Sequence, residues 1–236
     1  TTPASVTTSS PQLSTSGGTT KLYLGITGDL LQLDVTGTTF IANTNPATVA
    51  GRVSVGTSGA TTRVFAGDNG HTMWAISPTN FTGTNYIWKY NTVSNVNGSS
   101  YYDTSTDTLQ FGTAGGTVIV LTGAGNGGSP GTGVTLNASY PFTLNASDPI
   151  TSPPLYYGGV MVVGTTLGKL YFLDRNTGVS PGVSIISEYY FGPSESVSGI
   201  AFDSNVNRFM VSTSSAAKDA RLYYFDLVND PTPTFK

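Results

Sequence analysis

The amino-acid sequence predicts an all-β fold built from a repeated antiparallel unit. Apolar residues occur in short runs of strand length, and Gly, Asn, Asp and Pro punctuate them. No segment of useful length carries the 3.6-residue period of an amphipathic helix. One hairpin pattern also returns five times along the 236 residues, and a repeat constrains the architecture as well as the fold class.

The repeated hairpin is clearest at residues 158–178, where two apolar strands are joined by a tight turn and followed by Asp-Arg-Asn-Thr-Gly. A small residue closes the first strand of each copy, and the copies lie roughly 40 to 50 residues apart, which is the period of a propeller blade. These closing residues are Gly25, Gly67, Gly112, Gly164 and Ser212. The hairpin cores are predicted near residues 21–35, 63–77, 108–122, 160–174 and 208–226.

A further short strand is predicted on each side of every hairpin. The preceding strands are expected in "PQLSTS", "GRVSVGT", "SSYYDTS", "SPPLYYGG" and "VSGIAFDS". The following strands are expected in "TTFIAN", "NYIWKY", "GVTLNAS", "VSIISEYYF" and "PTFK". Four strands per unit predict a β-propeller of four-stranded antiparallel blades. Five blades are the simplest interpretation, and a fragment of a six- to eight-bladed ring is the alternative.

Two turns have the residue types that hairpins need. Asp68-Asn69-Gly70 is expected to supply the positive φ angles of a two-residue hairpin turn. Residues 174–178 predict a longer turn that ends in a left-handed Gly. Both support antiparallel strand pairing within a blade.

The segment "GKLYFLDRNTG", residues 168–178, resembles the repeat of the PQQ-like β-propeller family. In that family a strand ends in Leu-Asp and the turn after it ends in Thr-Gly. The resemblance is good in the fourth hairpin and loose in the other four. It implies the blade architecture, and we expect no cofactor.

The chain divides into a polar segment at 1–18 and one propeller domain at 19–236. The first segment is uncharged and rich in Ser and Thr, so an isolated copy is expected to lack structure. It is expected either to lie on its own propeller or to add as a strand to a neighbouring molecule. The predicted assembly segment is Ala4, Ser5, Val6, Thr7 and Thr8.

Composition narrows the function classes. Charged residues make up 10% of the chain and the net charge is −3, so the sequence lacks the basic footprint of a nucleic-acid-binding protein. With no cysteine, disulfides and thiolate metal sites are excluded. No apolar run reaches the roughly 18 residues of a membrane span. A low-charge surface rich in Ser, Thr, Asn and Gly is similar to that of prokaryotic surface-layer and filament subunits, which predicts an extracellular or cell-surface location.

Four other sequence features are candidate catalytic, ligand-binding or modification sites. His71 is the single histidine and lacks the partners of a catalytic triad or a zinc site. The Gly-rich segments 112–116 and 123–133 lack the helix and Lys of a phosphate loop. The turns 103–107 and 226–230 are oxygen-rich enough for calcium but lack EF-hand spacing. Sequons that permit glycosylation occur at Asn80, Asn97, Asn137 and Asn145.

Paired carboxylates in the propeller funnel would indicate a glycoside hydrolase. The candidates are Asp29, Asp34, Asp68, Asp103, Asp107, Asp174, Glu188, Glu195, Asp203 and Asp226. Most are predicted in turns or at strand ends, where Asp commonly caps the backbone. We therefore expect no catalytic residues. Four tyrosine doublets are expected to place one ring between blades and the other outward; they begin at Tyr101, Tyr156, Tyr189 and Tyr223.

The expected function is a non-catalytic structural or adhesive propeller whose partner is another copy of itself, as in a subunit of a surface filament. The alternatives are a carbohydrate-binding or glycoside-hydrolysing propeller, and a scaffold domain of a larger secreted protein.

Overall fold

The computed structural model describes residues 9–16, 18–37, 40–46, 48–59, 61–125, 134–138, 140–144, 148–174, 183–216, 220–226 and 234–235. Within them the chain forms antiparallel sheets and no helix. The described residues thus contain no helix with the length and apolarity to cross a membrane. The predicted assembly segment, Ala4 to Thr8, lies outside the described residues.

Each sheet is a meander of strands consecutive in sequence. The first contains β1 (Gln12–Ser16), β2 (Thr19–Ile26), β3 (Asp29–Asp34) and β4 (Phe40–Asn43), and the second contains β5 (Ser54–Ser58), β6 (Thr61–Gly67), β7 (Thr72–Ile76) and β8 (Trp88–Asn91). The third contains β9 (Ser100–Asp103), β10 (Thr108–Gly112), β11 (Thr117–Thr122), β12 (Thr135–Leu136) and β13 (Phe142–Thr143). The fourth contains β14 (Leu155–Tyr157), β15 (Val160–Gly164), β16 (Lys169–Asp174) and β17 (Ser184–Tyr190), and the fifth contains β18 (Ser196–Asp203), β19 (Arg208–Ser214), β20 (Arg221–Asp226) and β21 (Thr234–Phe235).

All five hairpins and their flanking strands lie where the sequence predicts them. Strand β1 falls inside the segment expected as a polar tail and forms the first strand of the first sheet. The third sheet has five strands because β12 and β13 both pair with β11, at different positions along it. The other four sheets have the predicted four strands.

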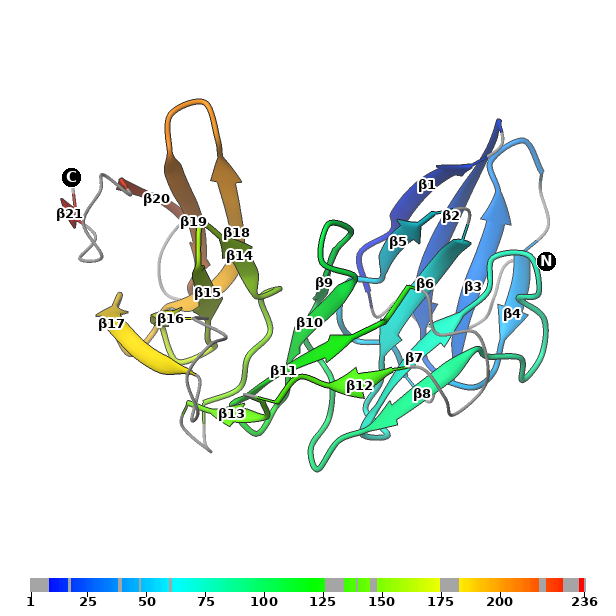
Figure 1. The fold of residues 1–236 in the computed structure, drawn as a ribbon, viewed down its shortest axis with the longest axis horizontal. Coiled ribbons are helices and arrows are strands. Elements are labelled where there is room, and N and C mark those ends of the chain that lie inside the picture. Colours follow the sequence, from blue (N-terminus) through cyan, green and yellow to red (C-terminus); the bar gives the residue numbers. More distant parts are fainter. Residues whose placement is uncertain are drawn as a thin grey trace.

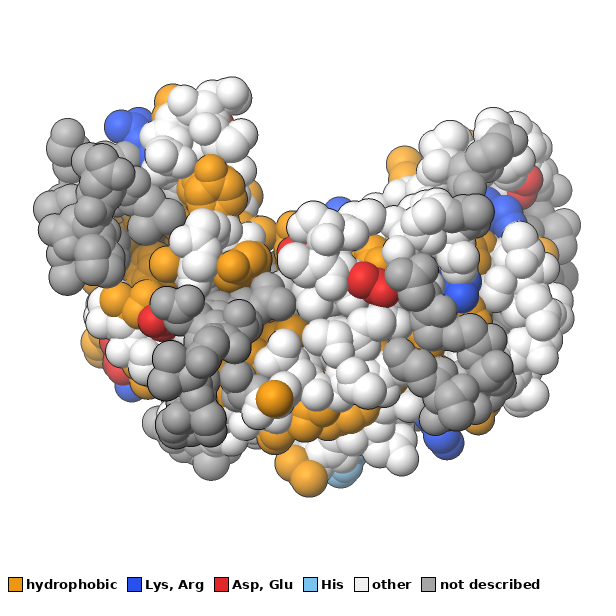
Figure 2. Space-filling view, in the orientation of Figure 1, with side chains coloured by type: hydrophobic (Ala, Val, Ile, Leu, Met, Phe, Trp, Pro, Cys, Tyr) orange, Lys and Arg blue, Asp and Glu red, His pale blue; other side chains and the backbone are white. Residues whose placement is uncertain are grey.

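The five sheets follow one another along an open arc. The first strands of neighbouring sheets contact each other, as in β1 with β5, β5 with β9 and β14 with β18, so these strands are innermost. Figure 1 shows β1–β4 at one end of the arc and β18–β21 at the other. The space-filling view shows a deep hollow between the two ends (Figure 2).

Four hydrophobic clusters hold the arc together, each between two consecutive sheets. For example, Phe65 and Met73 of the second sheet pack with Leu109 and Phe111 of the third. The other clusters join the first sheet to the second, the third to the fourth and the fourth to the fifth. None of these clusters of described residues joins the first sheet to the fifth.

The repeated glycine has a packing role at these junctions. In the first three sheets it lies beneath an apolar residue of the connection to the next sheet, and in the fourth sheet it lies beneath a residue of strand β18. The pairs are Gly25 with Val49, Gly67 with Val96, Gly112 with Ile150, and Gly164 with Val197. A Cβ added at any of these glycines would come closer than 3.0 Å to that side chain. The glycine therefore allows consecutive sheets to approach closely.

The turn at Asp68-Asn69-Gly70 differs from the prediction. The backbone N–H of Asp68 donates to the Thr72 carbonyl, which closes a longer turn than the expected two-residue one. Its positive φ belongs to His71, at 64°, and not to Gly70. The Asp68 carboxylate accepts bonds from the N–H groups of Gly70 and Thr72, which stabilises this turn. The predicted turn at 174–178 lies outside the described residues, apart from Asp174.

The tyrosine doublets follow the predicted alternation. Tyr102, Tyr156, Tyr189 and Tyr223 pack in or against the clusters between sheets. The second members of three doublets are exposed, namely Tyr157, Tyr190 and Tyr224. Period-two alternation along a strand explains both positions.

Candidate functional site: the axial groove and the two open faces

The inner strands of all five sheets line a groove on the propeller axis. Its volume is about 340 Å³. The strands β1, β5, β9, β14 and β18 contribute Gln12, Val55, Tyr101, Leu155 and Ile200, respectively. Concave sites of this kind are where folded domains usually bind small ligands, so the groove is the first candidate site.

Arg52 is the one cationic side chain among the described residues that line the groove. The Arg52 guanidinium donates two hydrogen bonds to Gln12 Oε1, of 3.0 Å from Nε and 2.6 Å from Nη2. The Arg52 backbone N–H donates to Ser99 Oγ at 3.0 Å. No Asp or Glu is among the described residues that line this groove. The groove therefore offers hydrogen-bond donors and a tyrosine ring rather than paired carboxylates.

The predicted carboxylates lie in turns and at junctions, apart from one another. Asp34 accepts from the Thr36 N–H and hydroxyl, and these bonds lower its carboxyl pKa. For Asp103, burial raises the pKa, but hydrogen bonds from Ser105 and Thr106 outweigh it, so the net shift is downward. Both carboxylates are thus held ionised by their own turns.

The carboxylates of Asp68 and Asp107 also accept hydrogen bonds from groups near their own turns. Asp68 also accepts a 2.7 Å bond from the Trp74 indole N–H. Asp107 accepts from the Tyr102 hydroxyl at 2.7 Å and from the backbone N–H of Gly125. Burial, followed by this bond to Asp107, raises the pKa of Tyr102 to about 12.

The two glutamates form ion pairs. Glu188 pairs with Lys169 at 2.8 Å on the surface of the fourth sheet. Glu195 is buried between the fourth and fifth sheets, where it accepts a 2.8 Å bond from the Thr213 hydroxyl and pairs with Arg221.

Four further aspartates complete the predicted set of carboxylates. Asp29 begins β3, Asp174 ends β16, and Asp203 accepts from the Asn205 N–H in the turn after β18. The side chain of Asp226 lies outside the described residues. No group of three or more His, Asp and Glu residues that could hold a metal occurs in the described part of the chain.

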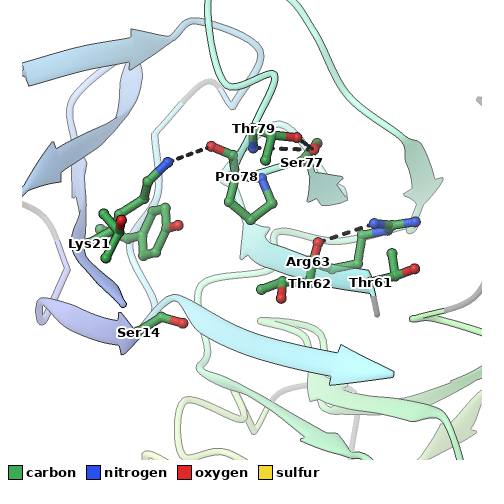
Figure 3. A pocket seen from close by; sticks show the side chains of 10 residues that line it. Ser14, Lys21, Thr61, Thr62, Arg63, Ser77, Pro78 and Thr79 are labelled. Atoms are coloured by element: carbon green, nitrogen blue, oxygen red, sulfur yellow. Dashed lines mark hydrogen bonds between the residues drawn. The ribbon is translucent and has the colours of Figure 1, made fainter. Parts of the chain in front are cut away.

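A second pocket, of about 390 Å³, lies between the first and second sheets (Figure 3). Hydroxyl groups of Ser14, Thr62 and other Ser and Thr residues line it. Lys21 Nζ donates to the Pro78 carbonyl at 2.9 Å, and Figure 3 shows this bond across the pocket. The Lys21 ammonium therefore already has a protein partner.

The four predicted glycosylation sites have varied settings. Asn80 is exposed in a loop, while Asn97 and Asn137 are half-buried. Asn145 lies outside the described residues, as do most of residues 123–133. Glycosylation remains a prediction, best placed at Asn80.

The outer face of the first sheet is an apolar surface that sequence reasoning missed. Leu13, Leu22, Leu33 and Phe40 form one row across all four strands, because each lies opposite the next in the strand register. Leu24 and Leu31 form a second row on the same face. These six residues are called the leucine face. Leu13 is 58% exposed, Leu31 is buried, and the other four are half-buried. The sequence signal was leucine at alternate positions in both strands of the first hairpin.

The fifth sheet has an apolar outer face at the other end of the arc. Ala201, Met210 and Tyr224 form a row, and Leu222 lies in the adjacent row opposite Ser212. Leu222 is 54% exposed and Tyr224 is 48% exposed. The residues Ala201, Met210, Leu222 and Tyr224 are called the tyrosine face.

Comparison with solved structures identifies the fold. BamB from Moraxella catarrhalis matches with a TM-score of 0.56 and 15% identity over 93% of this chain and 58% of that one. The β-propeller domain of Cps50 (Swd1) from Myceliophteria thermophila matches with a TM-score of 0.59 and 12% identity over 96% of this chain and 73% of that one. No family model and no curated protein matches. The chain has a β-propeller fold, and it spans 58% of the BamB chain.

Proposed function

We propose that this protein is a non-catalytic structural or adhesive propeller of the cell surface that assembles with copies of itself. The observation that carries the proposal is the pair of apolar faces at the two ends of the arc. Their exposed apolar side chains, Leu13, Leu222 and Tyr224, support an interaction role, because water contact with large apolar side chains is unfavourable.

The chemistry of the described residues supports a structural role. The carboxylates of Asp68 and Asp103 act in turns and those of Glu188 and Glu195 act in ion pairs. The described lining of the axial groove contains no carboxylate. A low charged fraction and the absence of cysteine agree with a surface location. The "GKLYFLDRNTG" segment further supports kinship of the repeats with the PQQ-like type.

The test is electron microscopy of the full chain beside a variant that lacks residues 1–8. This deletion leaves β1 intact, which a deletion of residues 1–18 would not. Filaments or extended assemblies of the full chain support the proposal. Isolated arcs at every concentration would contradict it. Loss of assembly on deletion would assign a part to Ala4–Thr8.

The axial groove favours glycan binding as the second candidate function. Tyr101 and the Arg52–Gln12 pair supply an aromatic surface and hydrogen-bond donors of the kind that bind sugars. A glycan array and a hydrolysis screen test this candidate, with Tyr101→Ala as the binding variant. Intact mass of the native product tests the third candidate, a domain of a larger secreted protein.

A further inference from the structure

We infer that a polar pocket beside Arg52 binds an acidic saccharide, with the guanidinium on the anionic group and with hydroxyl and amide side chains around the sugar. This inference goes beyond self-assembly and does not depend on it. It sharpens the second candidate function, glycan binding, because it names the chemical class of the glycan and the side chains that select it.

The pocket is formed by the segments that lead into the inner strands of four consecutive sheets. Its volume is about 490 Å³. The polar side chains that line it precede β1, β5, β9 and β14, and they are Ser9, Ser10, Arg52, Asn97, Ser99 and Thr151. We call it the connection pocket. Its walls therefore lie at junctions between sheets that follow one another in the chain.

Close backbone packing holds these segments in place. A Cβ added at Gly51 or at Gly98 would come closer than 3.0 Å to a backbone carbonyl oxygen of the next segment. The Arg52 N–H donates to Ser99 Oγ at 3.0 Å, and the Ser99 N–H donates to the Thr151 carbonyl at 3.1 Å. The pocket is thus preorganised, which reduces the entropic cost of binding a ligand.

The first sheet joins the pocket through a hydrogen bond that the fourth sheet repeats. Ser9 Oγ accepts from the Gly25 N–H at 2.7 Å, as Ser152 Oγ accepts from the Gly164 N–H at 3.1 Å. Gly25 and Gly164 are the repeated glycines of these two sheets. Ser9 therefore has a defined position, three residues before its inner strand, and Ser152 has the same position before β14.

Arg52 makes the pocket favourable for an anion. The described lining of the pocket contains no Asp or Glu, and Arg52 takes part in no ion pair with a described residue. The neutral Gln12 amide accepts from one edge of the guanidinium, through Nε and Nη2. The other edge, with Nη1 and the second Nη2 N–H, has no acceptor among the described residues. This edge has the fork geometry that a carboxylate, sulfate or phosphate group accepts.

The rest of the lining favours a ligand with hydroxyl groups over a bare ion. Four of the polar side chains carry hydroxyls, which both donate and accept hydrogen bonds. Asn97 Oδ1 is buried and has no partner among the described residues. An unpaired acceptor is costly, so an amide that turns to meet a ligand hydroxyl is stabilised. Arg52 also lines the axial groove with Tyr101, and a second sugar ring can lie on that aromatic ring.

The test is calorimetric titration of the full chain with trigalacturonate, with the neutral galactose trisaccharide of the same linkage, and with inorganic sulfate. Arg52→Gln removes the charge, and Asn97→Asp adds a negative charge while keeping the shape of the side chain. Lys89→Gln is the matched control, because Lys89 is an exposed cation on β8, the outermost strand of the second sheet. Thermal melting checks that all three variants fold like wild type.

The expected result is that wild type binds trigalacturonate about tenfold or more tightly than it binds the neutral trisaccharide or sulfate. Arg52→Gln and Asn97→Asp should each weaken this binding about tenfold or more, and Lys89→Gln should leave it unchanged. Added salt should weaken it as well, because the contact is ionic.

Three results would overturn the inference. Sulfate that binds as tightly as trigalacturonate would show that only the anionic group is recognised. Equal binding of both trisaccharides, unchanged by Arg52→Gln, would remove the acidic specificity and leave glycan binding as a candidate function. A wild type that binds none of the three probes would remove the site and leave self-assembly standing.

Discussion

Leu121 and Leu33 hold equivalent positions in the third and first sheets, yet their surroundings differ. Leu121 is fully buried in the cluster between the second and third sheets, whereas Leu33 is half-buried on the leucine face. Both are the last apolar residue of the second hairpin strand. The same repeat position is thus fully packed inside the arc and only half-buried at its end.

The largest expected effect is the difference in unfolding free energy between alanine variants of these two leucines. Leu121→Ala removes a fully packed side chain and should lower the free energy of unfolding by about 2–5 kcal/mol. Leu33→Ala should cost less than about 1 kcal/mol in dilute monomer, because less packing is lost. Urea unfolding at low protein concentration measures both. Equal losses would show that the leucine face is covered within one copy.

The next comparison uses the small residue that closes the first hairpin strand of each sheet. Gly112→Ala pushes a Cβ into Ile150 and should cost about 1–3 kcal/mol of stability. Ser212→Ala at the equivalent position of the fifth sheet should stay within about 0.5 kcal/mol of wild type. Thermal unfolding measures the stability of the two variants. A large loss of stability from Ser212→Ala would mean that a tight junction exists at the fifth sheet too.

Two buried glutamines, one in the third sheet and one in the first, differ in whether their amide groups are hydrogen-bonded. The Gln110 amide is fully buried, and neither its oxygen nor its nitrogen has a partner among the described residues. Gln110→Met should therefore raise the free energy of unfolding by about 1 kcal/mol. Gln32 is also buried, but its Nε2 donates to the Pro78 carbonyl at 3.0 Å. Gln32→Met should lower stability by about 1 kcal/mol, and a shift of the same sign in both variants would refute this account.

The smallest effect at neutral pH concerns Tyr102, which stays protonated there. Burial raises its folded-state pKa to about 12, above the 10.0 of a free tyrosine. Its contribution to stability is complete below pH 10 and is lost as the pH rises toward 12. Tyrosinate absorbance of wild type minus that of Tyr102→Phe should show one group titrating near pH 12. A difference curve centred near pH 10 would contradict the buried position.

Strand pattern and repeat predicted most of the fold. Alternation and turn residues located all five hairpins, because each hairpin is a local structure whose signals lie within about 20 residues. Pairing of β12 and β13 with the same strand was not predictable, since two short segments share one edge of β11 at different positions. The positive φ of His71 was also missed, because the Asp68 carboxylate stabilises a turn that residue type alone assigned to Gly70.

The candidate site was less predictable than the fold. The sequence located carboxylates in turns, and the structure shows their hydrogen bonds there. It did not indicate the groove around Arg52, because residues from five strands far apart in sequence converge on it. Nor did it show that Leu22, Leu24 and Leu33 are only half-buried, since a strand pattern is the same whether or not its face is covered.

The most direct measurement of the open arc uses the absence of native cysteine. A double variant, Leu13→Cys with Leu222→Cys, places one thiol on each end face, and a short bis-maleimide then links any faces that meet. The account predicts a ladder of covalent multimers whose yield rises with protein concentration. A single internally linked monomer, formed equally at all concentrations, would show that the five sheets close on themselves and would contradict the account.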